Sequence, residues 1–237
     1  MTAGLRTAKT TEFKGFSSAA LKMIAVVTMF IDHAAFILLE PWLDSPVLAG
    51  TGLSLQAWDL IYQVCRLIGR LSFPIFSFLI VVGFKHSRSP VRYLIRMVIF
   101  AVLSEIPFNL AYGSLIDPAH QNVMWTFAIS LGLLLLLRRF TRHYWLVLPA
   151  MGLAWLMQTD YHAYGVLMVF YLYVAYDEPH RDIGGAVLGL YQATAALAFV
   201  PIHFFNGEKG RQSRWFFYIF YPAHLLLLVL IRHLIFA

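Results

Sequence analysis

The residues of this sequence that could do chemistry are a few ionisable side chains set inside long apolar runs. In chain order they are Asp32, His33, Arg66, Arg70, Glu105 and His224. An ionisable side chain inside a membrane span is costly unless it faces the protein interior and finds a partner, so function is the first hypothesis for these residues. The alternative is a buried ion-pair network that only fixes the order of the helices.

His33 is the natural proton acceptor of this set, because a histidine can remove a proton from a nucleophile near neutral pH. Asp32 precedes it and points about 100° away around a helix, so the two cannot pair directly. We expect a carboxylate from another run to meet His33, and Glu105 is the candidate. For His33 and for His224, the alternative is a core histidine bonded to a backbone carbonyl.

Arg66 and Arg70 are four residues apart, which places them on one helix face. There their planar guanidinium groups could bind an anion or a carboxylate through paired hydrogen bonds. A metal is not expected. The single cysteine, Cys65, excludes an intramolecular disulfide and a cysteine-based metal site, and the spacing H-E-x-x-H is absent.

The elements that position these residues must be membrane helices. Of the 237 residues, 60% are apolar and 13% are charged, with a mean hydropathy of +0.70. A soluble domain is nearer a quarter charged. The sequence therefore predicts an all-α, polytopic bundle of about eight transmembrane helices, with residues 1–20 as a cytoplasmic tail and 21–237 as a single domain. The expected spans are 21–39, 60–84, 92–112, 122–138, 144–158, 163–176, 183–205 and 214–236.

Basic residues alternate between the connections, which indicates the orientation. The N-terminal segment and the second, fourth and sixth connections hold four, four, three and one Lys or Arg, whereas the first, third and fifth hold none. This pattern predicts that both termini are cytoplasmic and argues against a nucleic-acid partner. The seventh connection, with Lys209, Arg211 and Arg214, would lie outside and breaks the pattern. Either one span is miscounted or this loop has a task of its own.

The predicted orientation brings the ionisable residues to one depth. His33 lies about 12 residues from the inner end of its span, or roughly 18 Å. Glu105 lies similarly deep, and the arginines descend from the outer surface to the same layer. Tyr221 and His224 of the last span fall at this level too.

The chain resembles the TraX family, named for a conjugal-transfer protein that acetylates F-pilin. The resemblance covers nearly the whole chain from residue 21 onward. Its motifs are Asp32-His33, RLIGRLSFPIFSFLIVVGFKHS at 66–87, SEIPFNL at 104–110, NVMWT at 122–126, DYHAYGVL at 160–167, ALAFVPIHFFNGEKG at 196–210 and FYIFYPAHLLLL at 217–228. Val82 departs from the family, in which many members have Glu at this position.

This resemblance implies a multi-pass inner-membrane acyltransferase that takes an acyl group, expected to be acetyl, from cytoplasmic acyl-CoA. The acceptor would be an amine or hydroxyl at the outer side, on pilin, a glycan or a lipid. His33 matches the intramembrane histidine of similar acyltransferases. The other polar positions of the family motifs correspond here to Arg66, Arg70, Glu105, Asn122, Asp160, Asn206 and His224.

The residues themselves suggest how such a donor and acceptor would be held. The phosphates of acyl-CoA would bind bases at the cytoplasmic ends of the spans, namely Lys22, Lys85, Arg92 and Arg96. An arginine or an amide would stabilise the oxyanion, and the loop with Lys209 could bind an anionic acceptor.

Two other classes of function compete with this reading. A proton-coupled transporter or flippase also needs Asp, Glu, His and Arg in mid-membrane, but inverted repeats with broken helices are not evident here. In a non-catalytic assembly factor the same charges would only hold helices together. Acyl-CoA chemistry by the purified protein would separate the three.

Overall fold

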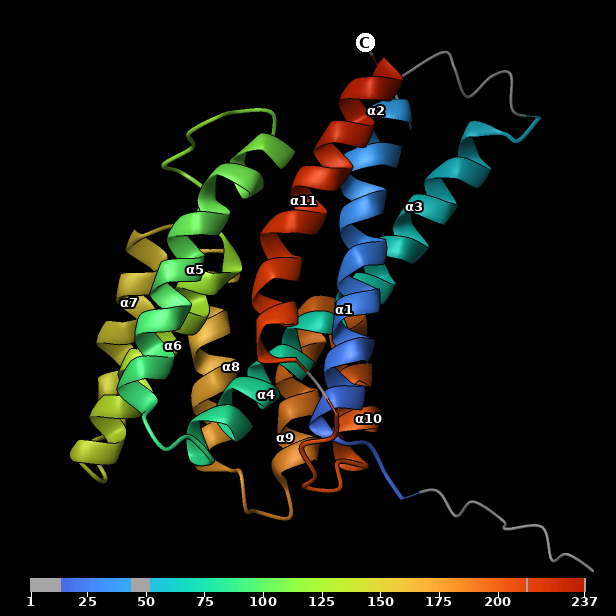
Figure 1. Cartoon of the computed structure of the whole chain (residues 1–237). Coiled ribbons are helices and arrows are strands. Elements are labelled where there is room, and N and C mark those ends of the chain that lie inside the picture. Colours follow the sequence, from blue (N-terminus) through green and yellow to red (C-terminus); the bar gives the residue numbers. More distant parts are fainter. Residues whose placement is uncertain (1–13, 44–51, 212, 237) are drawn as a thin grey trace, which may run out of the picture.

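A computed structural model describes residues 14–43, 52–211 and 213–236, and these residues form a bundle of helices (Figure 1). The expected all-α class is confirmed for the described residues, in which β-structure is limited to isolated bridges. The helical elements are α1 (Ser18–Ala34), η1 (Ala35–Leu39), α2 (Glu40–Leu43), α3 (Leu55–Gly69), α4 (Ser72–Lys85), α5 (Pro90–Ala111), α6 (Val123–Arg139), η3 (Tyr144–Leu146), α7 (Val147–Leu156), α8 (His162–Val174), α9 (Arg181–Gly189), η4 (Leu190–Ala198), α10 (Phe199–His203) and α11 (Arg214–Phe236).

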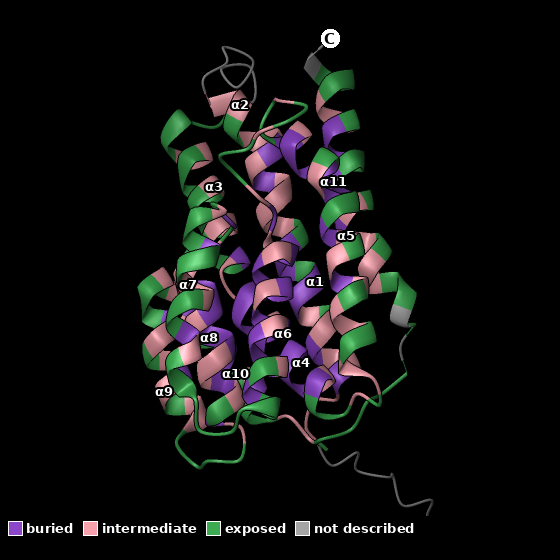
Figure 2. Cartoon of the chain, turned by 90° about the vertical axis from the view of Figure 1, so that its left-hand side faces the viewer, coloured by how far each residue is buried: buried purple, intermediate pink, exposed green. Residues whose placement is uncertain are grey.

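The surface of the bundle is apolar, as a lipid environment requires. On α5, for example, Ile95, Ile99, Val102 and Ile106 follow helical spacing and are all about half exposed. Figure 2 shows exposed residues on the outer faces of the helices and buried residues in the middle. By length and composition alone, five helical segments of the described chain could cross a bilayer: Ser18–Leu43, Leu55–Lys85, Pro90–Ala111, Arg181–His203 and Trp215–Ile235. The chain is a helical membrane protein.

The centre of the bundle is α4, which packs against α1, α6, α8 and η4. Nearly all of its side chains are buried, including Phe73, Phe78 and Phe84.

α1 does not end as a regular α-helix. Just after His33 it passes directly into the π-helical turn η1. Such turns shift the register of a helix and are frequent at functional sites.

The segment expected to span the membrane at residues 183–205 folds back on itself instead. At Gln192 and Ala193 the backbone leaves the helical region, so α9 and the η4–α10 arm form an antiparallel hairpin. Its two arms pack so closely that a Cβ on Gly189 would lie 2.8 Å from the Cα of Ala196. At the open end, the imidazole of His203 lies 2.9 Å from the carboxylate of Asp182.

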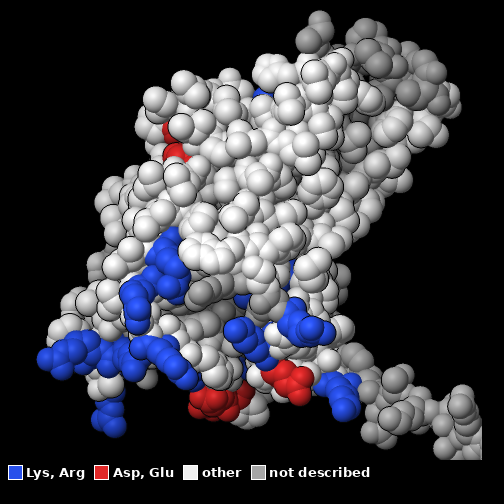
Figure 3. All heavy atoms as spheres, viewed as in Figure 1, with Lys and Arg blue, Asp and Glu red and all other residues white. Residues whose placement is uncertain are grey.

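The hairpin brings the basic loop at 206–210 to the end of the bundle where α1 begins. The N–H groups of Ser18 and Ala19 donate to the carbonyls of Glu208 (2.8 Å) and Lys209 (3.1 Å). The predicted outer position of Lys209 is therefore wrong, and a miscounted span explains the broken charge pattern. Figure 3 shows Lys and Arg gathered at this end of the molecule.

α11 runs parallel to α1, so the described ends of these two helices do not confirm the prediction that both termini share one side. Lys22 lies over the ring of Phe217 near the start of both helices, and His33 meets His224 further along both. The far end of α11 lies at the same end of the bundle as α2, opposite the end where α1 begins (Figure 1). The described chain therefore does not confirm eight continuous spans: the segment expected at 183–205 is a hairpin, and α7 and α8 have only 10 and 13 residues.

This topology predicts the outcome of reporter fusions. Fusions after residues 88, 139, 181 and 208 should report one side of the membrane, and fusions after residues 117 and 237 the other. The observation behind this is that the loop at 206–210 caps α1. A fusion after residue 237 that reports the same side as residue 88 would contradict the parallel arrangement of α1 and α11.

Candidate functional site

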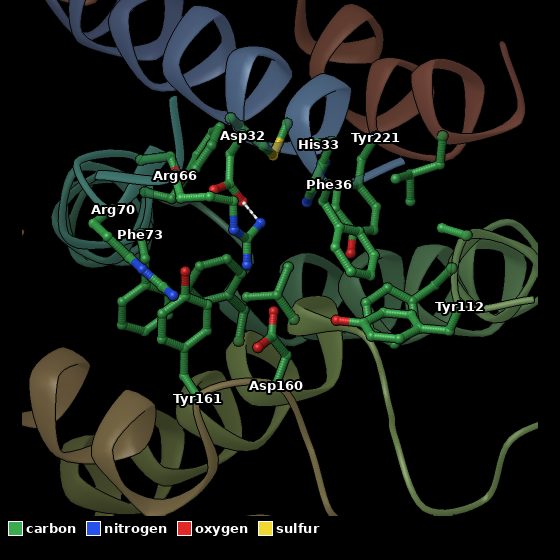
Figure 4. Close-up of a pocket in the computed structure, with 18 residues that line it drawn as sticks. Asp32, His33, Phe36, Arg66, Arg70, Phe73, Tyr112, Asp160, Tyr161 and Tyr221 are labelled. Atoms are coloured by element: carbon green, nitrogen blue, oxygen red, sulfur yellow. Dashed lines mark ion pairs between the residues drawn. The ribbon is translucent and has the colours of Figure 1, made fainter. Parts of the chain in front are cut away.

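A small cavity lies in the middle of the bundle, between α1, α3, α4, α5, α6 and α11, with a volume of about 80 Å³. Figure 4 shows its polar side chains pointing toward one another from these elements. The ionisable residues that line it are Asp32, His33, Arg66, Arg70 and Asp160, with Tyr112, Tyr161 and Tyr221 beside them. Two acids and two arginines balance in formal charge, as a site inside a membrane needs.

Asp32 and Arg66 form an ion pair across the contact of α1 with α3. The Nη1 of Arg66 lies 2.9 Å from Oδ2 of Asp32, and both side chains are mostly buried. The helices can approach this closely because Gly69 has no side chain: a Cβ there would lie 2.2 Å from the Cβ of Asp32. Arg66 also lies over the ring of Phe36, so the guanidinium is held on two sides.

His33 is hydrogen-bonded to His224, and the chain of contacts fixes both tautomers. The Nδ1 of His224 lies 2.7 Å from the carbonyl oxygen of Phe220, which can only accept, so this nitrogen carries the proton. With both rings neutral, Nε2 of His224 is the acceptor for Nδ1–H of His33 at 2.7 Å. Nε2 of His33 is then unprotonated. Since His33 lines the cavity and its Nδ1 is engaged, Nε2 is the nitrogen left for a ligand.

Aromatic rings close the opposite wall of the cavity. Phe73 of α4 stacks on Tyr161 with 3.7 Å between ring centroids and 10° between planes. Tyr161 adopts a positive φ of 66° in the turn between α7 and α8, which turns its ring toward α4. Figure 4 shows Arg70 extending toward Tyr161. The turn that holds Asp160 and Tyr161 therefore lies at the depth of His33 rather than at the outer surface.

A second and larger cavity, which we call the basic groove, lies nearer the start of α1 and has a volume of about 500 Å³. Its charged lining residues are Lys22, Arg96 and Lys209. Its walls are mostly apolar or aromatic and include Leu79, Met97, Trp215, Phe217 and Tyr218. A groove with cations at one end and apolar walls suits a ligand with an anionic head and a less polar arm.

The structure thus brings together most of the polar residues that the sequence singled out. One cavity is lined by His33, Asp32, Arg66, Arg70, Asp160 and Tyr221. His224 is hydrogen-bonded to His33. The expected shared layer agrees with the positions of these residues except Asp160, which was expected in an outer turn, and α11 runs in the direction opposite to the one expected.

Glu105 is not the partner of His33. Its carboxylate accepts hydrogen bonds from the Nδ2 of Asn122 and the Nε1 of Trp125, and it does not line the cavity. Asn122 also caps α6 and donates to the carbonyl of Ala101, so these two residues join α5 to α6. The expected role of Glu105 as the carboxylate that meets His33 finds no support in this geometry, and Asn122, a polar position of the family motifs, lines neither cavity.

The expected phosphate-binding residues divide into two groups. Lys22 and Arg96 line the basic groove, whereas Lys85 pairs with Asp177 at 2.8 Å and Arg92 is exposed outside the groove. Lys209, expected on the acceptor side, joins the groove instead. Asn206, another polar position of the family motifs, lies in the same loop and donates to the carbonyl of Lys14 (3.1 Å).

Several lining residues were not foreseen from the sequence. Phe73, Tyr112 and Tyr161 form aromatic walls, and Gly69 allows the Asp32–Arg66 pair to form. For Gly69 the signal was its place between Arg66 and Arg70. For the aromatic residues the sequence offers little, because 16% of the chain is Phe, Trp or Tyr.

Comparison with known proteins places the chain in a family. The sequence model described as TraX protein matches residues 17–232. The chain is also similar to the probable fimbrial assembly protein FimC, serogroup H1, of Dichelobacter nodosus, with 29% identity over 90% of this chain and 94% of that protein. No solved structure matches the chain.

The contact at Gly69 predicts a difference between two glycine substitutions. Gly69→Ala should destabilise the protein by about 1–3 kcal/mol, because the new methyl group would displace Asp32 from Arg66. Gly132→Ala is the control, since a Cβ at this helical position meets nothing within 4 Å and alanine favours a helix. Thermal unfolding in detergent measures both. Equal melting temperatures for the two variants would show that the close approach at Gly69 is not required.

Proposed function

Because the chain belongs to the TraX protein family, we propose that it is a membrane acyltransferase that moves an acyl group from acyl-CoA to an amine or hydroxyl. Acyl-CoA would enter the basic groove, and the acceptor would reach the cavity from the other side. Since acyl-CoA is a cytoplasmic compound, the protein would reside in the cytoplasmic membrane, with the start of α1 facing the cytoplasm.

The observation that carries this proposal is the hydrogen-bonded chain from the Phe220 carbonyl through His224 to His33. It leaves Nε2 of His33 as the unprotonated nitrogen of a residue that lines the cavity, and an unprotonated nitrogen is what a general base for acyl transfer requires. Asp32 remains bound to Arg66 and does not compete for the ring.

The reaction can be written on these residues. The acceptor nitrogen or oxygen attacks the thioester carbonyl, and its proton passes to Nε2 of His33. The carbonyl oxygen becomes an oxyanion, which the remaining N–H groups of Arg66 or the guanidinium of Arg70 would stabilise. The C–S bond then breaks, and the proton moves from His33 to the thiolate. The products are the acylated acceptor and CoA with a free thiol.

The basic groove supports acyl-CoA as the donor. Lys22, Arg96 and Lys209 would bind the phosphates at the end where α1 begins. From Lys22 to His33 the chain rises 11 residues, or roughly 16 Å. An extended pantetheine arm is long enough to carry the thioester over such a distance. Lys85 and Arg92 are not part of this proposal, because neither lines the groove.

A pilin is the acceptor that the comparisons favour. The relative in Dichelobacter nodosus is named for fimbrial assembly, and the family is linked to modification of pilin. A glycan or lipid hydroxyl would use the same base.

The proposal predicts unequal effects for three histidine substitutions. His33→Ala should lower acyl transfer by about a hundredfold or more, the usual contribution of a general base. His224→Ala should cause a smaller loss, because His33 keeps its lone pair but loses the group that fixes its tautomer. His143→Ala is the control, as His143 is exposed in the loop after α6.

The measurement is single-turnover acyl transfer and acyl-CoA binding by purified, folded variants. Binding should survive in all three, because the groove cations lie at the end where α1 begins. Normal transfer by His33→Ala would remove this residue from the mechanism, and substrate flux without release of CoA would identify a transporter.

The arginines predict a separate pattern. Arg66→Lys should fold, because the ammonium can still pair with Asp32, but transfer should fall by about tenfold or more as the planar fork is lost. Arg66→Ala should cost about 3–5 kcal/mol of stability by leaving a buried carboxylate unpaired. Arg70 forms no ion pair among the described residues, so Arg70→Lys tests the need for a planar guanidinium alone. If both Lys variants transfer normally, the arginines serve only as counter-charges.

A further inference from the structure

The small cavity and the basic groove meet at one side chain. Among the residues that the structure describes, Phe76 alone lines both. Every other side chain from Ser72 to Val82 is buried, whereas Phe76 is partly exposed, because it has open space on two sides. The ring of Phe76 is therefore the partition between the two compartments.

The helices on either side show that the two compartments form one path along the bundle. On α4, Phe73 faces the small cavity, and Ile80 and Gly83, one and two turns beyond Phe76, face the groove. On α11, Tyr218 lines the groove and Tyr221 the cavity. Residues spaced by three or four lie on one face of a helix. One face of α4 and one face of α11 therefore line both compartments, and the ring of Phe76 lies between the two compartments.

We propose that Phe76 is the residue that sets the length of the acyl group that can be transferred. This inference rests on the proposed function. The thioester end of the donor must pass Phe76 to reach His33, and the space beyond the ring is about 80 Å³. Pockets for drug-sized ligands start at about 300 Å³. An acetyl group fits beyond the partition with the attacking atom of the acceptor, whereas a longer chain collides with Phe76 and the facing wall.

The partition also separates water at the basic end from the reacting thioester. A closed aromatic ring at this point favours transfer to the acceptor over hydrolysis, because water from the groove does not reach the carbonyl freely. Opening the partition should therefore change two properties together: tolerance of longer chains, and hydrolysis of the thioester without an acceptor.

The first test compares acetyl-CoA with hexanoyl-CoA on the purified full-length protein, by release of the free thiol. We expect Phe76→Ala to lower the preference for acetyl by about tenfold or more, since one methylene in a tight pocket already changes rates by this factor. Phe170→Ala is the matched control. Phe170 is also partly exposed on a helix, and it lines neither cavity. An unchanged preference in an active Phe76→Ala protein would overturn the proposal.

The second test does not depend on acyl-CoA chemistry. Met29 lines the small cavity beyond Phe76, so Met29→Cys in a Cys65→Ser background places one thiol there. A small charged methanethiosulfonate reagent is added from the side of the basic groove. Adding Phe76→Ala should speed labelling about tenfold, and adding Phe170→Ala should leave the rate unchanged.

The two tests separate this inference from the proposed function. Equal labelling with and without Phe76→Ala shows that the ring is not a partition, which overturns the inference whatever the donor is. Faster labelling in a protein that neither binds nor turns over acyl-CoA contradicts the proposed function, and the role in chain length falls with it. Faster labelling together with a relaxed preference for acetyl supports both.

Discussion

The ion pair between Asp32 and Arg66 is the interaction on which the arrangement of the site depends. Removing water from a charged carboxylate is costly, and in this bundle a guanidinium at 2.9 Å offsets the cost. The pair holds α1 against α3, and the absence of a side chain at Gly69 allows that approach. With Asp32 directed toward α3, His33, about 100° further around α1, is directed toward α11 and meets His224.

The sequence predicted the chemistry of the site better than its topology. Asp32, His33 and Arg66 could be chosen from the cost of a charge in hydrocarbon, and the structure places all three around one cavity. The predicted partner of His33, Glu105, was wrong. Two histidines far apart in sequence give no signal that they pair, whereas a carboxylate is the usual partner to expect for a histidine. His224 was foreseen at the right level but not in this role.

The hairpin at residues 181–203 could not be predicted from hydropathy, because its composition and length are those of a membrane span. Its glycines and alanines were the available signal, since small residues let helix arms approach closely. The excess of basic residues at 206–214 was the second signal, because the structure places the loop at 206–210 beside the start of α1. Lys209 consequently moved from the acceptor side to the groove.

These features describe a path rather than an isolated site. Cations lie at the entrance of the groove, Phe76 divides the path, and His33 lies beyond it beside Arg66. An enzyme that joins a donor from one side of a membrane to an acceptor from the other needs a continuous route for the reacting group and a barrier against water. In the proposed function, the two cavities supply the route and the ring of Phe76 supplies the barrier.

The central claim is that two neutral histidines present one unprotonated nitrogen to the cavity. Nitrogen-15 NMR of the histidine side chains, in protein reconstituted in lipid nanodiscs, tests it most directly, with His33 and His224 assigned by single substitutions. The account predicts that near neutral pH both rings carry their proton on Nδ1, with Nε2 of His33 unprotonated. A proton on Nε2 of His33, or a ring that is fully charged, would contradict it.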